Sequence, residues 1–426
     1  MTDMRANPEQ VLSNARQALR SSPSVGAPAY QRYCAELARR LEEHWPEVRR
    51  ANDQDVHEAQ RRGLPATIVD RLRLTDQHLT DLTSRAAEVG EGLASFARRK
   101  PEHRVGDSIA LRRVHKPLGV LFLVYEARPT VTFDGALLPV AMGNAVLLRG
   151  GKEMALTDAA LQEVARAALR DAGLPEHLVT VINDADRSVM KAFLARPDAI
   201  DVLIPRGSPS LVDYCRSNSS IPLIASGGGA NHLYVHRSAN LGMAAEVTLD
   251  SKIPEPAGCT SVELVLVDEE VGDRYLAALH KSASARGEEL TVRLGPGLTP
   301  PHTSGGPLRV ESLQEYDLGR EFASPTIGVL AVSGVDAAVR HIGEHGSAHT
   351  EGVITAEPAV AEEFTGRVDA AALIVNGSLR LHDAPTLGLG PELAISTGRL
   401  HARGPVTLED LVTHSWLVES EGALRG

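Results

Sequence analysis

The chain has 426 residues, 43% hydrophobic and 23% charged, which is enough apolar content to build more than one hydrophobic core. A formal net charge of -11 disfavours nucleic acid and anionic membranes as partners and favours a small-molecule substrate. The start, MTDMRANPEQ, has no signal-peptide pattern, and no stretch approaches the roughly 20 apolar residues of a membrane span, so we expect a cytoplasmic protein.

Three cysteines, Cys34, Cys215 and Cys259, lie far apart along the chain. They do not form the CxxC pairs that are typical of zinc sites and redox dithiols. We therefore expect reduced thiols and no metal.

The first hundred residues are predicted to be helical. Apolar residues recur at helical spacing in VLSNARQALR and YCAELARRLEEHW, with few Gly or Pro interruptions. A run of helices is expected over residues 8–100.

From residue 111 the pattern changes to short apolar runs that alternate with amphipathic stretches. Strands are expected at 120–125, 145–151, 178–183, 199–207 and 221–226, and helices in the stretch ending at Met142 and at 160–173, 187–196 and 210–217. Such alternation is typical of a parallel sheet with helical crossovers. It predicts a doubly wound α/β domain.

A second α/β pattern follows NHLYVH. It contains AAEVTLDSK, the segment of Cys259, a strong strand at 261–268 and a helix at 273–287. Residues 294–307, rich in Gly and Pro, are predicted to form a surface loop.

Cys259 lies in SKIPEPAGCTSVEL, directly before the apolar strand and after two prolines and a glycine. A thiolate at such a junction attacks an activated carbonyl and forms a thioester that accepts a hydride. The alternative is a small, inert core residue, which is the more common fate of a free cysteine. Only the motifs around Cys259 favour the nucleophile.

The tract Gly227–Gly229 resembles part of a phosphate-binding loop. It lacks the lysine and the Ser or Thr that complete such a loop, so a tight turn is expected instead.

Five segments occur in order along the chain: YEARPTVTFDGALLPVAMGNAVLLRGGKE, LIPRGS, PEPAGC, HGSAHTE and STGRLHARGP. Each is weak alone, but together they span residues 125–405, which is 281 residues. From about residue 10 to the C-terminus the chain resembles the glutamate-5-semialdehyde dehydrogenases (γ-glutamyl phosphate reductases) of the aldehyde dehydrogenase superfamily.

The resemblance implies an aldehyde-dehydrogenase-like α/β fold. Residues 1–235 form a doubly wound nucleotide-binding domain, 236–375 an α/β catalytic domain with the nucleophilic cysteine, and 376–426 return to the cofactor domain and end in an oligomerisation strand. A small arm, to which residues 105–118 contribute, pairs SIALRRVHK with HSWLVESEG. A homodimer or homotetramer is expected.

NADPH is the implied cofactor. The matching positions are Arg149, Gly150, Gly151, Lys152 and Glu153 at the adenosine end, Pro205, Arg206 and Gly207 in a second stretch, and Glu321 at the nicotinamide ribose. Strand-end glycines allow close backbone approach, and a cation suits a 2′-phosphate. The alternative for Arg206 is a solvated charge.

The resemblance also implies a substrate pocket. Its candidates are Asn376, Arg380, Asp383, Ser396, Thr397, His401 and Arg403. Arg380 and Arg403 either bind a phosphate or carboxylate in bidentate fashion or form ion pairs. His349 is either a base or a structural residue.

This chain departs from the family pattern at three places. It reads ASGGGANH at 225–232 where the family has ETGVGNCH, so Ala225 replaces the carboxylate that activates water in hydrolytic aldehyde dehydrogenases. It has PEPAGCT in place of QRPGVCN, which introduces Glu255 and Thr260. Leu379 and Leu381 replace Thr and Phe.

The first hypothesis is NADPH-dependent reduction of γ-glutamyl phosphate to glutamate 5-semialdehyde, in proline biosynthesis, with Cys259 as nucleophile. Backbone N–H groups near Cys259 stabilise the oxyanion, and Lys252 either favours the thiolate or is a solvated surface lysine. The first alternative is a divergent paralogue that reduces another acyl phosphate or acyl thioester. The second is a non-catalytic nucleotide-binding relative.

Overall fold

A computed structural model describes residues 7–97, 103–106, 109–225, 227–300 and 306–425. The chain divides into unit 1, made of Met1–Ala225, Leu389–Ala394 and Val406–Gly426, and unit 2, made of Ser226–Gly388 and Ile395–Pro405. The division therefore follows Ala225 and not residue 235. Residues 376–388 and 395–405 stay with the second unit and do not return to the first.

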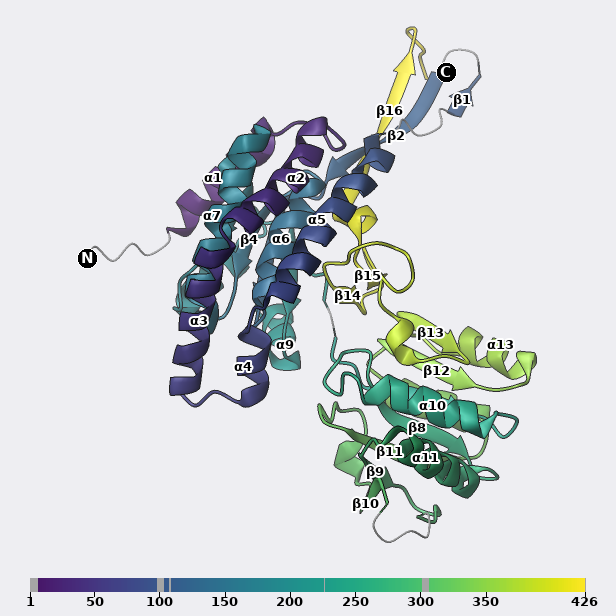
Figure 1. The fold of residues 1–426 in the computed structure, drawn as a ribbon. Helices are drawn as coiled ribbons and strands as arrows, with labels where there is room; N and C mark the ends of the chain where they lie inside the picture. Colours follow the sequence, from purple (N-terminus) through teal and green to yellow (C-terminus); the bar gives the residue numbers. More distant parts are fainter. Residues whose placement is uncertain (1–6, 98–102, 107–108, 226, 301–305, 426) are drawn as a thin grey trace. The chain divides into compact units, whose positions relative to one another are not determined.

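The N-terminal segment of unit 1 is helical over the described residues, as predicted, and residues 98–100 of the predicted run lie outside them. Its helices are α1 (Pro8–Ser21), α2 (Pro28–Glu43), α3 (Trp45–Arg61), α4 (Ala66–Leu72) and α5 (Asp76–Ala97). The Asn7 side chain caps α1 by accepting a hydrogen bond from the Glu9 N–H at 3.1 Å. Helix α2 packs on both α5 and α7 (Ala155–Ala172), and α7 is a crossover helix of the sheet (Figure 1).

A four-stranded parallel sheet forms the centre of unit 1. Its order is β5 (Val179–Val181), β4 (Ala145–Arg149), β3 (Val120–Tyr125) and β6 (Val202–Arg206). The sequence of β3, VLFLVY, is apolar throughout because a parallel strand is covered on both faces. The connecting helices are α6 (Pro129–Ala141), η1 (Lys152–Met154), α7, η2 (Glu176–Leu178) and α8 (Arg187–Leu194), and α9 (Pro209–Ser217) follows β6.

The predicted doubly wound α/β arrangement is confirmed for this sheet. One predicted strand differs. Residues 221–225 form an isolated bridge between Leu223 and Leu203 instead of a strand, with hydrogen bonds from the Leu203 N–H to the Pro222 carbonyl and from the Ile224 N–H to the Leu203 carbonyl, and residue 226 lies outside the described residues.

A buried amide closes the amino end of the sheet. Asn144 Nδ2 donates to the carbonyl oxygens of Pro139 (3.1 Å) and Leu411 (2.9 Å), and Asn144 Oδ1 accepts from the Gly119 N–H (3.0 Å). All three bonds go to backbone groups, so Asn144 ties the starts of β3 and β4 to the C-terminal segment.

The predicted arm is present in unit 1. Its antiparallel sheet has the order β1 (His103–Val105), β2 (Ile109–Pro117) and β16 (Val412–Ser420), and the register pairs Ile109 with Ser420 and Pro117 with Val412. Figure 1 shows β2 and β16 projecting together beyond the helices of unit 1. Trp416 and Val418 on β16 are 55% and 57% exposed.

Unit 2 is built on a seven-stranded parallel sheet. Its order is β10 (Leu308–Ser312), β9 (Leu290–Leu294), β11 (Thr326–Val332), β8 (Val262–Asp268), β7 (Asn231–Val235), β12 (Thr350–Ile354) and β13 (Ala372–Val375). Helices α10 (Leu241–Lys252) and α11 (Gly272–Arg286) share one hydrophobic core with the sheet, and α12 (Val335–His345) and α13 (Pro358–Arg367) share another. The sheet is therefore covered on both faces.

Short elements complete the two units. They are η3 (Glu315–Asp317), η4 (Leu379–Leu381), the strand pair β14 (Ile395–Ser396) and β15 (Gly404–Pro405), and η5 (Leu408–Leu411). The predicted loop at 294–307 separates β9 from β10, and its residues 301–305 lie outside the described residues. Over the described chain, no helix is both long enough and apolar enough to pass through a membrane.

Candidate active site

Three predicted segments meet at the amino-terminal edge of the unit 2 sheet. Because its strands are parallel, the residues that precede them lie at the same edge. Gly229 precedes β7, Cys259 precedes β8, and Glu321 precedes β11. The predicted nucleophile and the predicted ribose ligand therefore share one edge.

The backbone of Cys259 is held closely at this edge. Its carbonyl oxygen accepts a 2.8 Å hydrogen bond from Asn231 Nδ2. A Cβ atom on Gly229 would lie 1.9 Å from the same oxygen, so only glycine fits at this position. The Gly229 N–H donates to Glu321 Oε1 at 2.5 Å, which links the Cys259 turn to the Glu321 segment.

The three cysteines differ in exposure. Cys34 and Cys215 are fully buried, and burial raises the pKa of Cys34 to about 12 and that of Cys215 to about 11. Cys259 is half-buried, so solvent reaches this residue. The interpretation as an inert core residue suits Cys34 and Cys215, whereas the exposure of Cys259 is what a nucleophile requires.

Lys252, at the end of α10, is fully buried, so the alternative of a solvated surface lysine is wrong. Its Nζ lies 2.9 Å from both carboxylate oxygens of Glu263, and the Phe322 N–H donates to Glu263 Oε2 at 2.9 Å. Desolvation lowers the pKa of Lys252 and raises that of Glu263 to about 7, while the attraction between the two charges opposes both shifts. The buried pair anchors the segment of Glu321 through the neighbouring Phe322.

The motif STGRLHARGP contributes side chains with different surroundings. Thr397 lies beside the glycine tract, because a Cβ on Gly227 would be 3.0 Å from Thr397 Oγ1. Ser396 is buried, and its Oγ accepts from the Gly398 N–H. His401 is exposed. Arg403 pairs with Asp369 at 2.8 Å, which is the ion pair left open as the alternative.

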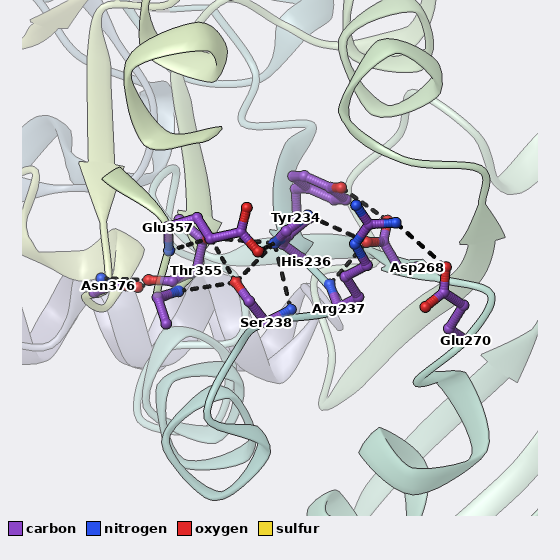
Figure 2. A network of polar contacts seen from close by, with 10 residues as sticks. Tyr234, His236, Arg237, Ser238, Asp268, Glu270, Thr355, Glu357 and Asn376 are labelled. Carbon is purple, nitrogen blue, oxygen red and sulfur yellow. Dashed lines mark hydrogen bonds and ion pairs between the residues drawn. The ribbon is translucent and has the colours of Figure 1, made fainter. Parts of the chain in front are cut away.

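The motif NGSLRLHD lies partly away from Cys259. Asn376 follows β13 at the carboxyl edge of the sheet, opposite Cys259, and its amide both accepts from the Thr355 N–H (2.9 Å) and donates to the Thr355 carbonyl (2.9 Å). Figure 2 shows this amide within a polar network that includes His236 and Asp268. We therefore do not retain Asn376 among the candidate substrate ligands.

Two other members of that motif have local partners. Asp383 Oδ2 accepts from the N–H and the hydroxyl of Thr386 and so shapes its own turn. Arg380 lies 3.8 Å from Asp250 in the last turn of α10, the helix that leads toward Cys259. Of Asp383 and Arg380, Arg380 is therefore the better candidate to bind an anionic group of the substrate.

His349 is buried and lies in a polar cluster with Thr350 and His382. Its Nδ1 lies 2.7 Å from Thr350 Oγ1, which also lies 2.8 Å from His382 Nδ1. Desolvation lowers the pKa of His349 to about 3 and that of His382 to about 4. A neutral imidazole with so low a pKa is a weak base, so the structural interpretation of His349 is favoured.

The predicted cofactor residues of unit 1 gather at the carboxyl edge of its sheet. Arg149 ends β4 and residues 150–153 follow it, while Pro205 and Arg206 end β6 and Gly207 follows it; β4 and β6 lie on either side of β3. The order of the strands reverses beside β3, which is where open α/β sheets bind ligands. Lys152 is exposed, and no ion pair involves it among the described residues.

The start of α9 at this edge is already occupied by a carboxylate. Glu126 Oε2 accepts from the Ser208 N–H at 2.7 Å, and a Cβ on Gly207 would lie 2.5 Å from the same oxygen. Arg206 donates to the Leu393 carbonyl, so it is not a solvated charge. Arg149 donates to the Asp184 carbonyl at 3.2 Å, and burial lowers its pKa.

The two glycines after β4 are crowded by carboxylates. A Cβ on Gly150 would lie 2.2 Å from Asp158 Oδ2, and one on Gly151 would lie 1.9 Å from Glu153 Oε1. Asp158 is buried and accepts from Thr132 Oγ1 at 2.5 Å, and desolvation raises the pKa of Asp158 to about 7. The buried Asp158 carboxylate therefore restricts position 150 to glycine, whereas the flexible Glu153 side chain could move away from a larger residue at position 151.

Comparison with known proteins agrees with this arrangement. Residues 5–315 match the aldehyde dehydrogenase family. The chain belongs to this family. It is 38% identical over 395 residues to the γ-glutamyl phosphate reductase of Salmonella paratyphi C, covering 92% of this chain and 94% of that protein. It is also 38% identical over 386 residues to that of Glaesserella parasuis serovar 5, covering 90% and 91%.

A solved structure gives the same result for the fold. The γ-glutamyl phosphate reductase of Thermotoga maritima superposes with a TM-score of 0.85 at 30% sequence identity, covering 98% of this chain and 100% of that chain. The predicted resemblance and the predicted aldehyde-dehydrogenase-like α/β fold are therefore confirmed.

The residues that depart from the family pattern differ in their exposure, and therefore in whether a substrate could contact them. Leu379 is fully buried in the core beneath α10 and α11, and Ala225 is also buried. Glu255, in contrast, is exposed in the turn that precedes Cys259. Of these three changes, Glu255 alone presents a new charge near the predicted nucleophile.

Two residues at this edge were not predicted from the sequence. Asn231 enters the buried strand β7 as a polar residue, and Glu263 interrupts the apolar run VELVLVD. A polar residue in a buried strand needs a hydrogen-bond partner, so the sequence could have predicted that both side chains form hydrogen bonds. The identity of the partners, the Cys259 carbonyl and Lys252, depends on the packed structure.

The glycine at position 229 is expected to be essential. In Gly229→Ala the new Cβ must displace the Cys259 carbonyl, so turnover should fall by about 100-fold, since small misplacements of reacting groups have effects of this size. The measurement is kcat and KM, with the urea unfolding midpoint recorded in parallel.

The matched control is Gly366→Ala in α13, where an added Cβ meets nothing within 4 Å. It should keep wild-type turnover and gain up to about 1 kcal/mol of stability from the better helix former. Wild-type turnover in Gly229→Ala would contradict the placement of the Cys259 carbonyl.

A second prediction concerns Asp158. The folded protein keeps this carboxyl protonated up to about pH 7, whereas the unfolded chain ionises it near its ordinary value of 3.8. Between these values the folded state binds more protons, so the free energy of unfolding falls as pH rises, by at most about 4 kcal/mol. Asp158→Asn should lose this part of the pH dependence.

The measurement is the thermal midpoint from about pH 4 to about pH 7, the range in which this linkage acts. An identical slope in wild type and Asp158→Asn would show that Asp158 is ionised throughout.

Proposed function

We propose that this protein is a γ-glutamyl phosphate reductase: with NADPH it reduces γ-glutamyl phosphate to glutamate 5-semialdehyde and releases phosphate, a step of proline biosynthesis, in the cytoplasm. The observation that carries the proposal is the half-buried Cys259, held through its backbone at the sheet edge, in a chain similar over nearly its whole length to proteins of that name.

The chemistry follows from the thiolate of Cys259. Its sulfur attacks the acyl carbon, an S–C bond forms, and the C–O bond to phosphate breaks, which leaves a thioester and free phosphate. When bound, NADPH supplies the hydride that reduces this thioester. The resulting thiohemiacetal oxyanion collapses, the C–S bond breaks, and the aldehyde leaves with the thiolate restored.

The chain contains no carboxylate at position 225 to activate water. Hydrolysis of the thioester is the reaction for which aldehyde dehydrogenases need that carboxylate. Ala225 therefore supports reduction of an activated acid over the formation of a free acid.

The residues at the unit 1 edge fit a phosphorylated dinucleotide. Lys152 offers an exposed cation beside Gly150 and Gly151, which suits a 2′-phosphate. Because Glu126 occupies the Ser208 N–H, the positive charge for the phosphates comes from Arg149 and Lys152 in this proposal. Unit 1 would thus be the nucleotide-binding domain and unit 2 the catalytic domain, with Glu321 on the nicotinamide ribose.

A second candidate is a relative that reduces a different acyl phosphate or acyl thioester. The exposed Glu255 beside Cys259 favours it, because a new negative charge discourages an anionic acyl group. The non-catalytic alternative is disfavoured by the exposure of Cys259.

We also propose a homodimer or homotetramer joined through the arm of β2 and β16. A small antiparallel sheet without its own core is marginal in water. Trp416 and Val418 lie on one face of β16 and expose large apolar surfaces, and the outer edge of β16 has no neighbouring strand among the described residues.

The proposed reaction is measured most readily in reverse. Purified protein is given glutamate 5-semialdehyde, phosphate and NADP⁺, and NADPH formation is followed. We expect phosphate-dependent turnover that falls by at least about 1,000-fold in Cys259→Ala, because the covalent step is lost.

Cys34→Ala is the matched control, since it removes a buried cysteine from the same chain. It should retain wild-type turnover. Residual turnover of wild-type size in Cys259→Ala would rule out the nucleophile, and silence of a folded wild-type protein that binds NADP⁺ would move the assignment to another activated acid.

The arm is tested by light scattering after gel filtration. The double variant Trp416→Lys with Val418→Lys should behave as a 45.5 kDa monomer, because charge on this face opposes its burial. Leu424→Lys, at a 92% exposed residue beyond β16, should keep the wild-type mass. A wild-type chain that is itself monomeric would contradict the proposal.

A further inference from the structure

Asn231 is the first residue of β7, and its side chain is completely buried. Asn231 Nδ2 donates to the carbonyl oxygens of Cys259 (2.8 Å) and Ser261 (2.7 Å), and Asn231 Oδ1 accepts from the Thr350 N–H (3.1 Å). Both amide hydrogens and one oxygen lone pair are used. The side chain therefore acts as a clamp on three backbone groups.

The three groups belong to two different segments. Cys259 and Ser261 lie in the turn that enters β8, and Thr350 begins β12. Strand β7 lies between β8 and β12, so its first side chain is well placed to reach both neighbours. The Ser261 N–H donates back to the Gly258 carbonyl at 3.0 Å, which closes the turn around Cys259.

Clamping the Cys259 carbonyl has a second effect. The peptide bond is planar and trans, so its C=O and N–H point in opposite directions. Once the Cys259 carbonyl is fixed toward Asn231, the direction of the Thr260 N–H is fixed as well. A backbone amide directly after a nucleophile is the kind of donor that stabilises an oxyanion in acyl transfer.

We propose that Asn231 is a positioning residue for acyl transfer. By holding the Cys259–Thr260 peptide, it fixes both the position of the nucleophile Cys259 and the direction of the Thr260 N–H. This inference rests on the proposed function of Cys259. Asn231 stands where the family pattern ETGVGNCH has a cysteine. A thiol, a weak donor with a single hydrogen, cannot make the three bonds of this amide. The clamp is therefore a property of this chain.

The chain contains a matched control. Asn144 in unit 1 is also completely buried, and its amide makes the same set of bonds, two to carbonyl oxygens and one from a backbone N–H. Replacing either Asn by Asp keeps the size and the acceptor but removes the two donors. The two variants therefore carry a comparable cost in folding, and only Asn231→Asp touches the Cys259 turn.

The experiment uses p-nitrophenyl acetate as a general acyl donor. Release of p-nitrophenolate reports acylation of Cys259 without any need for the natural substrate, and Cys259→Ala gives the background rate. In parallel, iodoacetamide alkylation of Cys259 is followed by peptide mass spectrometry, because alkylation at a saturated carbon forms no oxyanion. Circular dichroism and urea unfolding confirm that each variant is folded.

In Asn231→Asp the acylation rate should fall by about 100-fold, the size of effect expected for a lost oxyanion donor or a misplaced nucleophile. Alkylation of Cys259 should fall by a clearly smaller factor. Asn144→Asp should keep both rates. If Asn231→Asp does not fold, the uncharged Asn231→Ser is compared with Asn144→Ser, with the same expected order.

Acylation within about two-fold of wild type in folded Asn231→Asp would overturn the proposal, and so would an equal loss in Asn144→Asp, which would mark a general effect of stability. Failure of the proposed function gives a different result. In that case wild-type acylation at Cys259 persists while glutamate 5-semialdehyde gives no turnover.

Discussion

The carbonyl oxygen of Cys259 is the point on which the unit 2 edge depends. Asn231 donates to it, the α-carbon of Gly229 packs against it, and Glu321 binds the N–H of that glycine. Acyl transfer requires reacting groups to be held within about 0.5 Å of their productive positions. At this edge, backbone contacts hold the main chain of Cys259 in place.

In both units, glycines leave space for polar groups that pack against the backbone. At Gly229 a carbonyl oxygen takes the space of a Cβ atom, and at Gly150 and Gly151 the carboxylates of Asp158 and Glu153 do so. These glycines stand at strand ends, where polar groups pack closely against the backbone. Each edge also has a buried carboxyl, Asp158 in unit 1 and Glu263 in unit 2, and burial raises the pKa of both.

The buried pair of Lys252 and Glu263 fixes the neighbouring loop, but its burial costs free energy because both charges lose their hydration. Such a pair contributes little net stability compared with apolar residues, but the removal of one partner leaves an uncompensated charge. The pair is explained by the segments that it connects. Glu263 also accepts from the Phe322 N–H, so the pair holds the loop of Glu321 in register with the Cys259 turn.

The sequence was sufficient for features that depend on local pattern. Continuous apolar runs such as VLFLVY predicted buried parallel strands, the pairing of β2 with β16 followed from the family resemblance, and the position of Cys259 before β8 was correct. Hydrogen-bond partners could not be predicted in this way, because they depend on strand order. Asn376 is at the wrong edge for that reason, and Asn231 was overlooked although it lies beside Cys259 in space.

The central claim is that Cys259 carries the acyl group, and its most direct test is to isolate the acyl-enzyme. Protein is mixed with glutamate 5-semialdehyde and NADP⁺ without phosphate, quenched in acid and digested for mass spectrometry. Our account predicts a γ-glutamyl group on the peptide of Cys259 that disappears when phosphate is added before the quench. Turnover without any adduct on Cys259, or with the adduct on a different residue, would contradict it.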